Sequence, residues 1–160
     1  MSQKLVVTLG EVTSRSLVVP ANWVAELARV LSSVKQHAAS CVFKCIIGGW
    51  TTSHRMHEPE KLPCIFGCGD GLDEINHYFL CSPLWQIASR PMQIEAPLDL
   101  ARRLCTVSPT PESVRLLALV FSLYHFSKHR AKDLGGPPLI GPCTVQRIAF
   151  EASHALVKHV

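Results

Sequence analysis

Three cysteines and one histidine lie within eighteen residues near the middle of the chain, in the stretch CIFGCGDGLDEINHYFLC. They are Cys64, Cys68, His77 and Cys81, with the spacing Cys-x3-Cys-x8-His-x3-Cys. Thiolate sulfur and imidazole nitrogen are ligands that zinc prefers, and a structural zinc ion takes four ligands in a tetrahedron. These side chains therefore predict one structural zinc ion, because a full set of protein ligands leaves no open position for catalysis.

The sequence around these four residues suits a compact metal-binding loop. Glycine allows the backbone to fold closely around an ion, and the segment has three: Gly67, Gly69 and Gly71. Residues 72–81 have helical character, so His77 and Cys81, four positions apart, are expected on one helix face. Asp70 or Asp73 is a candidate cap for that helix. Two ligands on a turn and two on a helix can converge on one ion.

Two other interpretations of the cluster stay open at this point. Free cysteines behave as small buried hydrophobes, so Cys64, Cys68 and Cys81 could be ordinary core residues with His77 on the surface. A disulfide within the cluster is the second alternative. The chain has seven cysteines, an odd number that argues against a fully paired extracellular framework. A reducing intracellular compartment is therefore expected, with nucleus, cytoplasm and organelle all open.

A similar pattern occurs 23 residues earlier, at Cys41, Cys45, His54 and His57. A second metal ion is one interpretation of this set. Cys41 and Cys45 lie among apolar residues, however, so buried thiols are the interpretation that we favour. Neither cluster has the signature of a cysteine nucleophile, so we expect no catalytic activity and no small-molecule substrate.

Apolar periodicity predicts a mainly α fold around this cluster. Apolar residues recur at three- and four-residue steps over 20–34 and 144–159. Shorter segments with apolar residues follow the same trend at 38–47, 83–88 and 98–104. Thr110 followed by Pro111 marks the start of a long helix that should run to about Lys132. Short β-branched runs in residues 1–19 suggest an arm or hairpin. We therefore expect one helical domain over 20–160 that contains a zinc knuckle at 64–81.

The composition agrees with a folded domain outside the membrane. The chain has 160 residues, of which 48% are hydrophobic and 18% charged, and this balance is unlike that of disordered proteins. No apolar run approaches the roughly 20 residues that cross a bilayer, so no membrane insertion is expected. The first 20 residues lack the basic region and continuous apolar core of a secretory signal.

Basic residues offer a second kind of chemistry, the binding of phosphate. The candidates are Arg102, Arg103, Lys128, Arg130 and Lys132. The net charge of +4 permits an anionic partner without requiring one. Cations near the C-terminal end of a helix also interact favourably with its dipole, which is the alternative interpretation. Aromatic residues make up only 7% of the chain and do not alternate with the basic ones in sequence, so a base-stacking platform has little support.

Residues 37–88 resemble the zinc-binding region that follows the reverse transcriptase domain in many non-LTR retrotransposon polyproteins. The shared features are an apolar segment with Phe43 and Trp50, the run Thr52-Ser-His-Arg55-Met-His57, the cysteine pair, Asp73-Glu74 before His77, then Cys81 and Trp85. Three residues separate Cys64 and Cys68, where many members of the family have two. The resemblance implies a zinc-binding accessory module that helps to hold RNA or DNA. No Tyr-x-Asp-Asp signature occurs, so no polymerisation is expected.

A protein assembly is the alternative setting for such a module. A domesticated copy could serve as a structural subunit of a larger protein or ribonucleoprotein assembly, and the mean hydropathy of +0.20 favours this interpretation. An apolar position on the long helix would then face the protein partner, with Leu116, Val120 and Leu123 as candidates.

Overall fold

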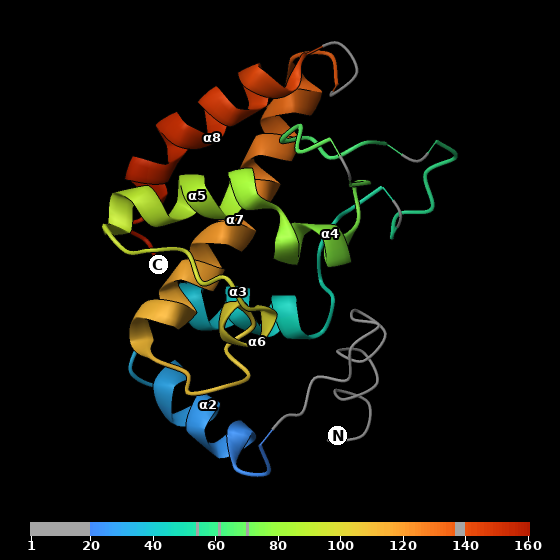
Figure 1. Ribbon diagram of the computed structural model, residues 1–160. Helices are drawn as coiled ribbons and strands as arrows, with labels where there is room; N and C mark the ends of the chain where they lie inside the picture. Colours follow the sequence, from blue (N-terminus) through green and yellow to red (C-terminus); the bar gives the residue numbers. More distant parts are fainter. Residues whose placement is uncertain (1–19, 54, 61, 70, 137–139) are drawn as a thin grey trace.

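The chain is organised around one long central helix. Its structure is a computed structural model that describes residues 20–53, 55–60, 62–69, 71–136 and 140–160 (Figure 1). The described residues form α2 (Trp23–Leu31), α3 (Gln36–Ile46), α4 (Ile75–Leu80), α5 (Ser82–Ser89), α6 (Leu100–Arg103), α7 (Pro111–Asp133) and α8 (Pro142–Leu156), with a 3-10 turn at Arg90–Met92. The only β pairing in this part is an isolated antiparallel bridge. The mainly α prediction is confirmed, and the predicted arm or hairpin at 1–19 lies outside the described residues.

The long helix α7 begins where the sequence predicts. The Thr110 hydroxyl accepts a hydrogen bond from the Ser113 N–H at 3.1 Å, and the Ser113 hydroxyl accepts one from the Thr110 N–H at 2.9 Å. This reciprocal cap satisfies two backbone donors at the start of a helix, and Pro111 has no N–H to satisfy. At the other end, Gly135 and Gly136 have φ values of 108° and 97°, which glycine adopts at low cost.

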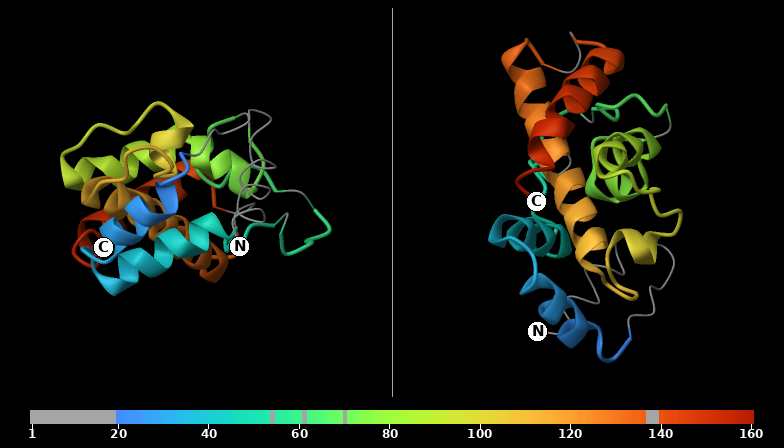
Figure 2. Two further views of the ribbon diagram at one scale, coloured as in Figure 1. Left: turned by 90° about the horizontal axis from the view of Figure 1, so that it is seen from below. Right: turned by 90° about the vertical axis from the view of Figure 1, so that its left-hand side faces the viewer.

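Helices pack against α7 on several sides. It contacts α2, α3, α5, α6 and α8, and Figure 2 shows it crossing the molecule between them. Leu116, Val120 and Leu123 are therefore at most 1% exposed. The prediction that one of them faces an external partner is wrong, because a helix that is apolar around most of its circumference is buried by its own domain.

The connection between α4 and α5 positions the cysteine cluster. Cys81 ends α4 and directly precedes α5, so the chain turns at a candidate ligand. Figure 1 shows α4 and α5 beside α7, with the loop of residues 62–69 next to them. Among the described residues, no helix combines the length and the apolar character that a membrane span requires.

Candidate metal centre

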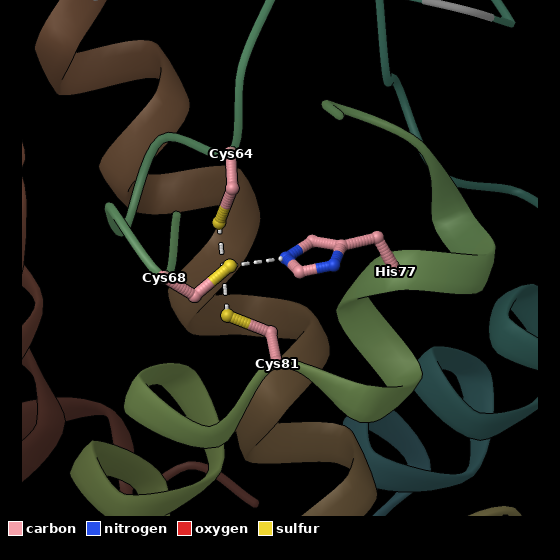
Figure 3. Close-up of side chains that lie close together, drawn as sticks. All are labelled: Cys64, Cys68, His77 and Cys81. Atoms are coloured by element: carbon pink, nitrogen blue, oxygen red, sulfur yellow. Dashed lines mark hydrogen bonds between the residues drawn. The ribbon is translucent and has the colours of Figure 1, made fainter. Parts of the chain in front are cut away.

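The four predicted ligands come together from a loop and a short helix. Cys64 and Cys68 lie on the loop, His77 lies in α4, and Cys81 lies at its end, with the side chains directed toward one another (Figure 3). One donor atom from each residue lies within 4.8 Å of the others. This group can hold one metal ion, and it is the only such group in the described part of the chain.

The distances between donor atoms suit a tetrahedral ion. The Cys64 and Cys81 sulfurs are 3.7 Å apart, and the Cys68 sulfur is 3.0 Å from His77 Nε2. A metal–sulfur bond of 2.3 Å places two sulfurs of a tetrahedron about 3.8 Å apart. The sulfur pair already has this spacing, while the sulfur–nitrogen pair would open slightly around an ion. Three thiols and an imidazole also form a donor set that structural zinc ions use.

Backbone hydrogen bonds shape the loop that carries the first two cysteines. The Cys64 N–H donates to the Gly71 carbonyl at 2.8 Å, next to the Pro63–Leu72 bridge. Gly67 has a φ of 68°, in the left-handed region that glycine favours. At Gly71 the constraint is space, because a β carbon there would lie 2.0 Å from His77 Nδ1. Glycine at this position lets the histidine ring lie directly against the backbone.

The loop is also fastened to α8. Phe66 is fully buried, and its carbonyl accepts a hydrogen bond from Gln146 Nε2 at 2.5 Å. A β carbon at Gly67 would lie 2.3 Å from Cβ of Pro142, the first residue of α8. The loop therefore lies between α4 and the N-terminal part of α8, and a metal ion held by the four ligands would fasten the loop to α4.

The acidic residue before the histidine has a structural role that the sequence did not reveal. The carboxylate of Asp73 is buried and accepts hydrogen bonds from the Ser53 N–H, the Tyr78 and Tyr124 hydroxyls and the Lys128 ammonium group, at 2.7–2.9 Å. The prediction that Asp73 caps the helix is wrong, since α4 has no side-chain cap. The carboxylate instead joins the segment before the loop, α4 and α7. The other candidate cap, Asp70, lies outside the described residues.

The surroundings of these groups change their proton affinity. Burial alone would raise the pKa of Asp73, but hydrogen bonds from Lys128, Ser53 and Tyr78 outweigh it and the pKa is lowered. The pKa of Cys64 is lowered, chiefly by the hydrogen bond between its sulfur and that of Cys81. The pKa of Cys81 is raised by the same bond and further by burial. A bound cation would replace this shared proton and hold both sulfurs as thiolates.

The two tryptophans that flank the cluster are buried beside it. Trp50 stacks on Tyr78 with ring centroids 5.9 Å apart and also contacts Tyr124 at 5.0 Å. Trp85 donates its indole N–H to the Tyr78 carbonyl at 3.1 Å. Phe43, in contrast, is 57% exposed. Trp50, Asp73 and Trp85 thus support the ligand-bearing helix, whereas Phe43 does not.

Two of the five predicted phosphate contacts have other partners. Arg103 is buried, donates to the carbonyls of Pro97 and Phe79, and has its guanidinium 4.8 Å from the Trp85 ring centroid. Lys128 forms an ion pair with Asp73 at 2.7 Å. The structure therefore contradicts the prediction for Arg103 and Lys128, because both side chains bind partners within the domain.

The remaining three basic candidates are exposed but do not share one surface. Arg102 lies in α6, while Arg130 and Lys132 lie in the last turns of α7. Figure 1 shows α6 in the lower half of the molecule and the end of α7 at the top. A single phosphate-binding face that includes all five residues does not exist.

The alternative of a second metal ion at Cys41, Cys45, His54 and His57 finds no support in the described residues, where no such group assembles. Cys41 and Cys45 are buried in α3, while His57 is exposed. The Cys41 sulfur lies 3.5 Å from His37 Nε2 and 3.7 Å from the Ser122 hydroxyl. His54 lies outside the described residues. Burial raises the pKa of both thiols, as expected for core cysteines.

Comparisons with known proteins place the chain in no group: no family model, no curated protein and no solved structure matches it.

Proposed function

We propose that this chain is a zinc-binding module that binds nucleic acid without catalysis, of the kind found after reverse transcriptase domains in non-LTR retrotransposons. The observation that carries the proposal is the convergence of Cys64, Cys68, His77 and Cys81 within 4.8 Å. Zinc is the proposed ion because three thiolates and one imidazole form a closed tetrahedral set for it. When bound, zinc would fix the loop against α4 and contribute no reactive site.

The nucleic-acid part of the proposal is supported by the resemblance over residues 37–88 and by charge. The net charge of +4 favours an anionic partner, and several arginines are exposed. The proposed role of the metal is indirect: it holds the loop whose carbonyl at Phe66 bonds to Gln146 on α8.

The metal is tested by elemental analysis of purified protein, which should contain about one zinc ion per chain. Cys68→Ser and His77→Ala should each lose the ion under mild chelation, because three remaining ligands do not close the tetrahedron. Cys143→Ser is the matched control, since Cys143 is exposed and outside the cluster. Folded protein without zinc, or a Cys143→Ser variant that loses it, would contradict the proposal.

Nucleic-acid binding is tested with fluorescent RNA and DNA oligonucleotides at low salt. Zinc-loaded protein should bind, and binding should weaken after chelation, because the loop that contacts α8 is then free to move. No binding to either oligonucleotide by the zinc-loaded protein would refute this part of the proposal.

A subunit of a protein assembly is a second candidate, favoured by one observation. Phe43 and Ile47, one turn apart at the end of α3, are 57% and 50% exposed. Exposed apolar side chains on one helix face are typical of protein contacts. In this case Phe43→Asp should release proteins that copurify from native extract, and Arg130→Gln should retain them.

A further inference from the structure

Two grooves run along α8, one on each side. The first has a volume of about 430 Å³ and lies between α7 and α8, with Phe126, Arg130, Leu134, Arg147, Ile148 and Glu151 among its lining residues. The second, of about 410 Å³, lies between α5 and α8, and its lining includes Pro83, Gln86, Arg90, Arg147 and Phe150. Arg147 belongs to both grooves, so α8 forms a ridge with an arginine at its crest. We call this surface the α8 face.

Arginines and aromatic rings lie side by side on the α8 face. The side chains of Arg130 and Arg147 are 57% and 70% exposed, one on α7 and the other on α8. Phe126 and Phe150 are 43% and 39% exposed, although both are large apolar side chains. The Arg90 guanidinium lies 5.9 Å from the Phe150 ring centroid. They come from three separate segments, the end of α5, α7 and α8, and the packing of these helices makes the three groups neighbours.

The acidic partners of Arg130 and Arg147 form only weak ion pairs with them. Arg130 pairs with Asp133 at 3.9 Å and Arg147 with Glu151 at 3.7 Å, and all four side chains are more than half exposed. Ion pairs of this kind are weak because water screens them. A phosphate, which accepts two hydrogen bonds from one guanidinium, can therefore displace a carboxylate here.

We propose that the α8 face is where this chain binds single-stranded nucleic acid, with Arg130 and Arg147 on phosphates and Phe150 stacked against a base. The inference rests on the proposed nucleic-acid function and gives it a location. Guanidinium groups track a phosphate backbone, and a base stacks on an exposed ring whatever its identity.

The α8 face is joined to the metal centre through two contacts. Pro83 and Gln86 lie in α5, which begins directly after the candidate ligand Cys81, and both line the second groove. Gln146, which lines the same groove, bonds to the loop at Phe66. The proposed zinc ion would thus fix the position of α5 and α8 at one groove without touching the nucleic acid.

The experiment measures binding of a labelled single-stranded oligonucleotide to zinc-loaded protein as salt is varied. One phosphate contact on a single strand contributes about −0.7 to the slope of log K against log salt. Arg130→Gln/Arg147→Gln should therefore flatten the slope by about 1.4 and weaken binding about 25-fold at 0.1 M salt. The matched control is Arg29→Gln/Arg102→Gln, which removes the same charge from exposed positions on α2 and α6 and should leave the slope unchanged.

A second pair of variants tests the stacking contact. Phe150→Leu should weaken binding about fivefold or more, because an aliphatic side chain does not stack on a base. Phe43→Leu removes another exposed ring, on α3, and should have no effect. Circular dichroism and zinc content check that each variant keeps the fold.

Three results would overturn the inference. Equal losses in the two arginine pairs would leave nucleic-acid binding intact but remove its location from the α8 face. Competition by polyglutamate as strong as by the oligonucleotide would show a general anion site without base stacking. Absence of any binding by the zinc-loaded wild type would refute the proposed function itself, and the α8 inference with it.

Discussion

Gly71 lies against the ring of His77, and only a hydrogen atom fits on its α carbon. A β carbon there would lie 2.0 Å from Nδ1 and 2.1 Å from Cε1 of the ring. The histidine is thus held by the backbone of the loop that carries the first two cysteines. Gly69 lies on the same loop, with a φ of 87°, but no atom lies within 4 Å of the place where its β carbon would be.

The pair of glycines gives a prediction at the residue scale. Gly71→Ala should push the imidazole away from the cysteines and lower zinc affinity about 10- to 100-fold, the range seen when groups that orient a ligand are lost. Gly69→Ala should strain the backbone but leave the ligand in place, so its zinc affinity should stay close to that of the wild type. Competition with a chromophoric chelator measures both, and equal affinities in the two variants would contradict this account.

At the scale of elements, the Asp73–Lys128 pair joins the segment before α4 to α7. The Asp73 side chain is fully buried and that of Lys128 is 17% exposed. Loss of one partner from a buried pair leaves the other charge uncompensated. The packing of the metal-binding elements on α7 therefore depends on a charge pair as well as on apolar contacts.

Asp73→Asn should destabilise the fold by about 3 kcal/mol, because Lys128 then lacks its counter-charge. Lys128→Met in addition should recover part of this loss, because the double variant contains no unpaired charge. The free energy of unfolding in urea measures each step of the cycle. Asp133→Asn, at an exposed position, is the control and should have little effect.

The same pair gives the domain a pH dependence of known sign. The pKa of Asp73 is below its ordinary value of 3.8, so the folded state favours the carboxylate. Its contribution is fully present above the unfolded pKa and is lost as the pH falls through the lower folded pKa. The free energy of unfolding of the wild type should therefore fall more steeply below about pH 4 than that of Asp73→Asn. Parallel pH profiles for the two proteins would refute this role.

At the scale of the whole molecule, most contacts of the helical core lie outside the metal centre. α2, α3 and α8 pack against α7 through residues outside 64–81, whereas the candidate ligands lie on a loop, on the short α4 and at the start of α5, with the loop in contact with the first turns of α8. A metal ion in this protein is therefore expected to stabilise the loop and α4 and to leave most of the other helices unchanged.

Chelation should therefore release the loop and α4 while most of the far-UV circular dichroism signal remains. Melting should shift to lower temperature, because an ion that binds only the folded state stabilises it. Collapse of the helical signal to that of an unfolded chain would show that the core requires the ion. His77→Ala should resemble the chelated wild type and respond no further to chelator.

The sequence alone determined the local features of this protein. The ligand spacing predicted the convergence of Cys64, Cys68, His77 and Cys81, because a turn and one helical face are short-range geometry. The cap at Thr110 was likewise readable, since capping depends on residues three positions apart. Apolar periodicity located the helices of the described region, although their ends differ by a few residues.

Which charges face the interior and which face solvent depends on how the helices pack. Arg103 and Lys128 look in sequence like surface cations, yet each is held by groups from distant segments. The sequence permits an exposed Leu116 that could contact a partner, but the surrounding helices bury it. Arg147 and Phe126 lie in different helices and border one groove. The physical reason is the same in each case: helix packing sets the environment of a side chain, and its neighbours in sequence do not contain that information.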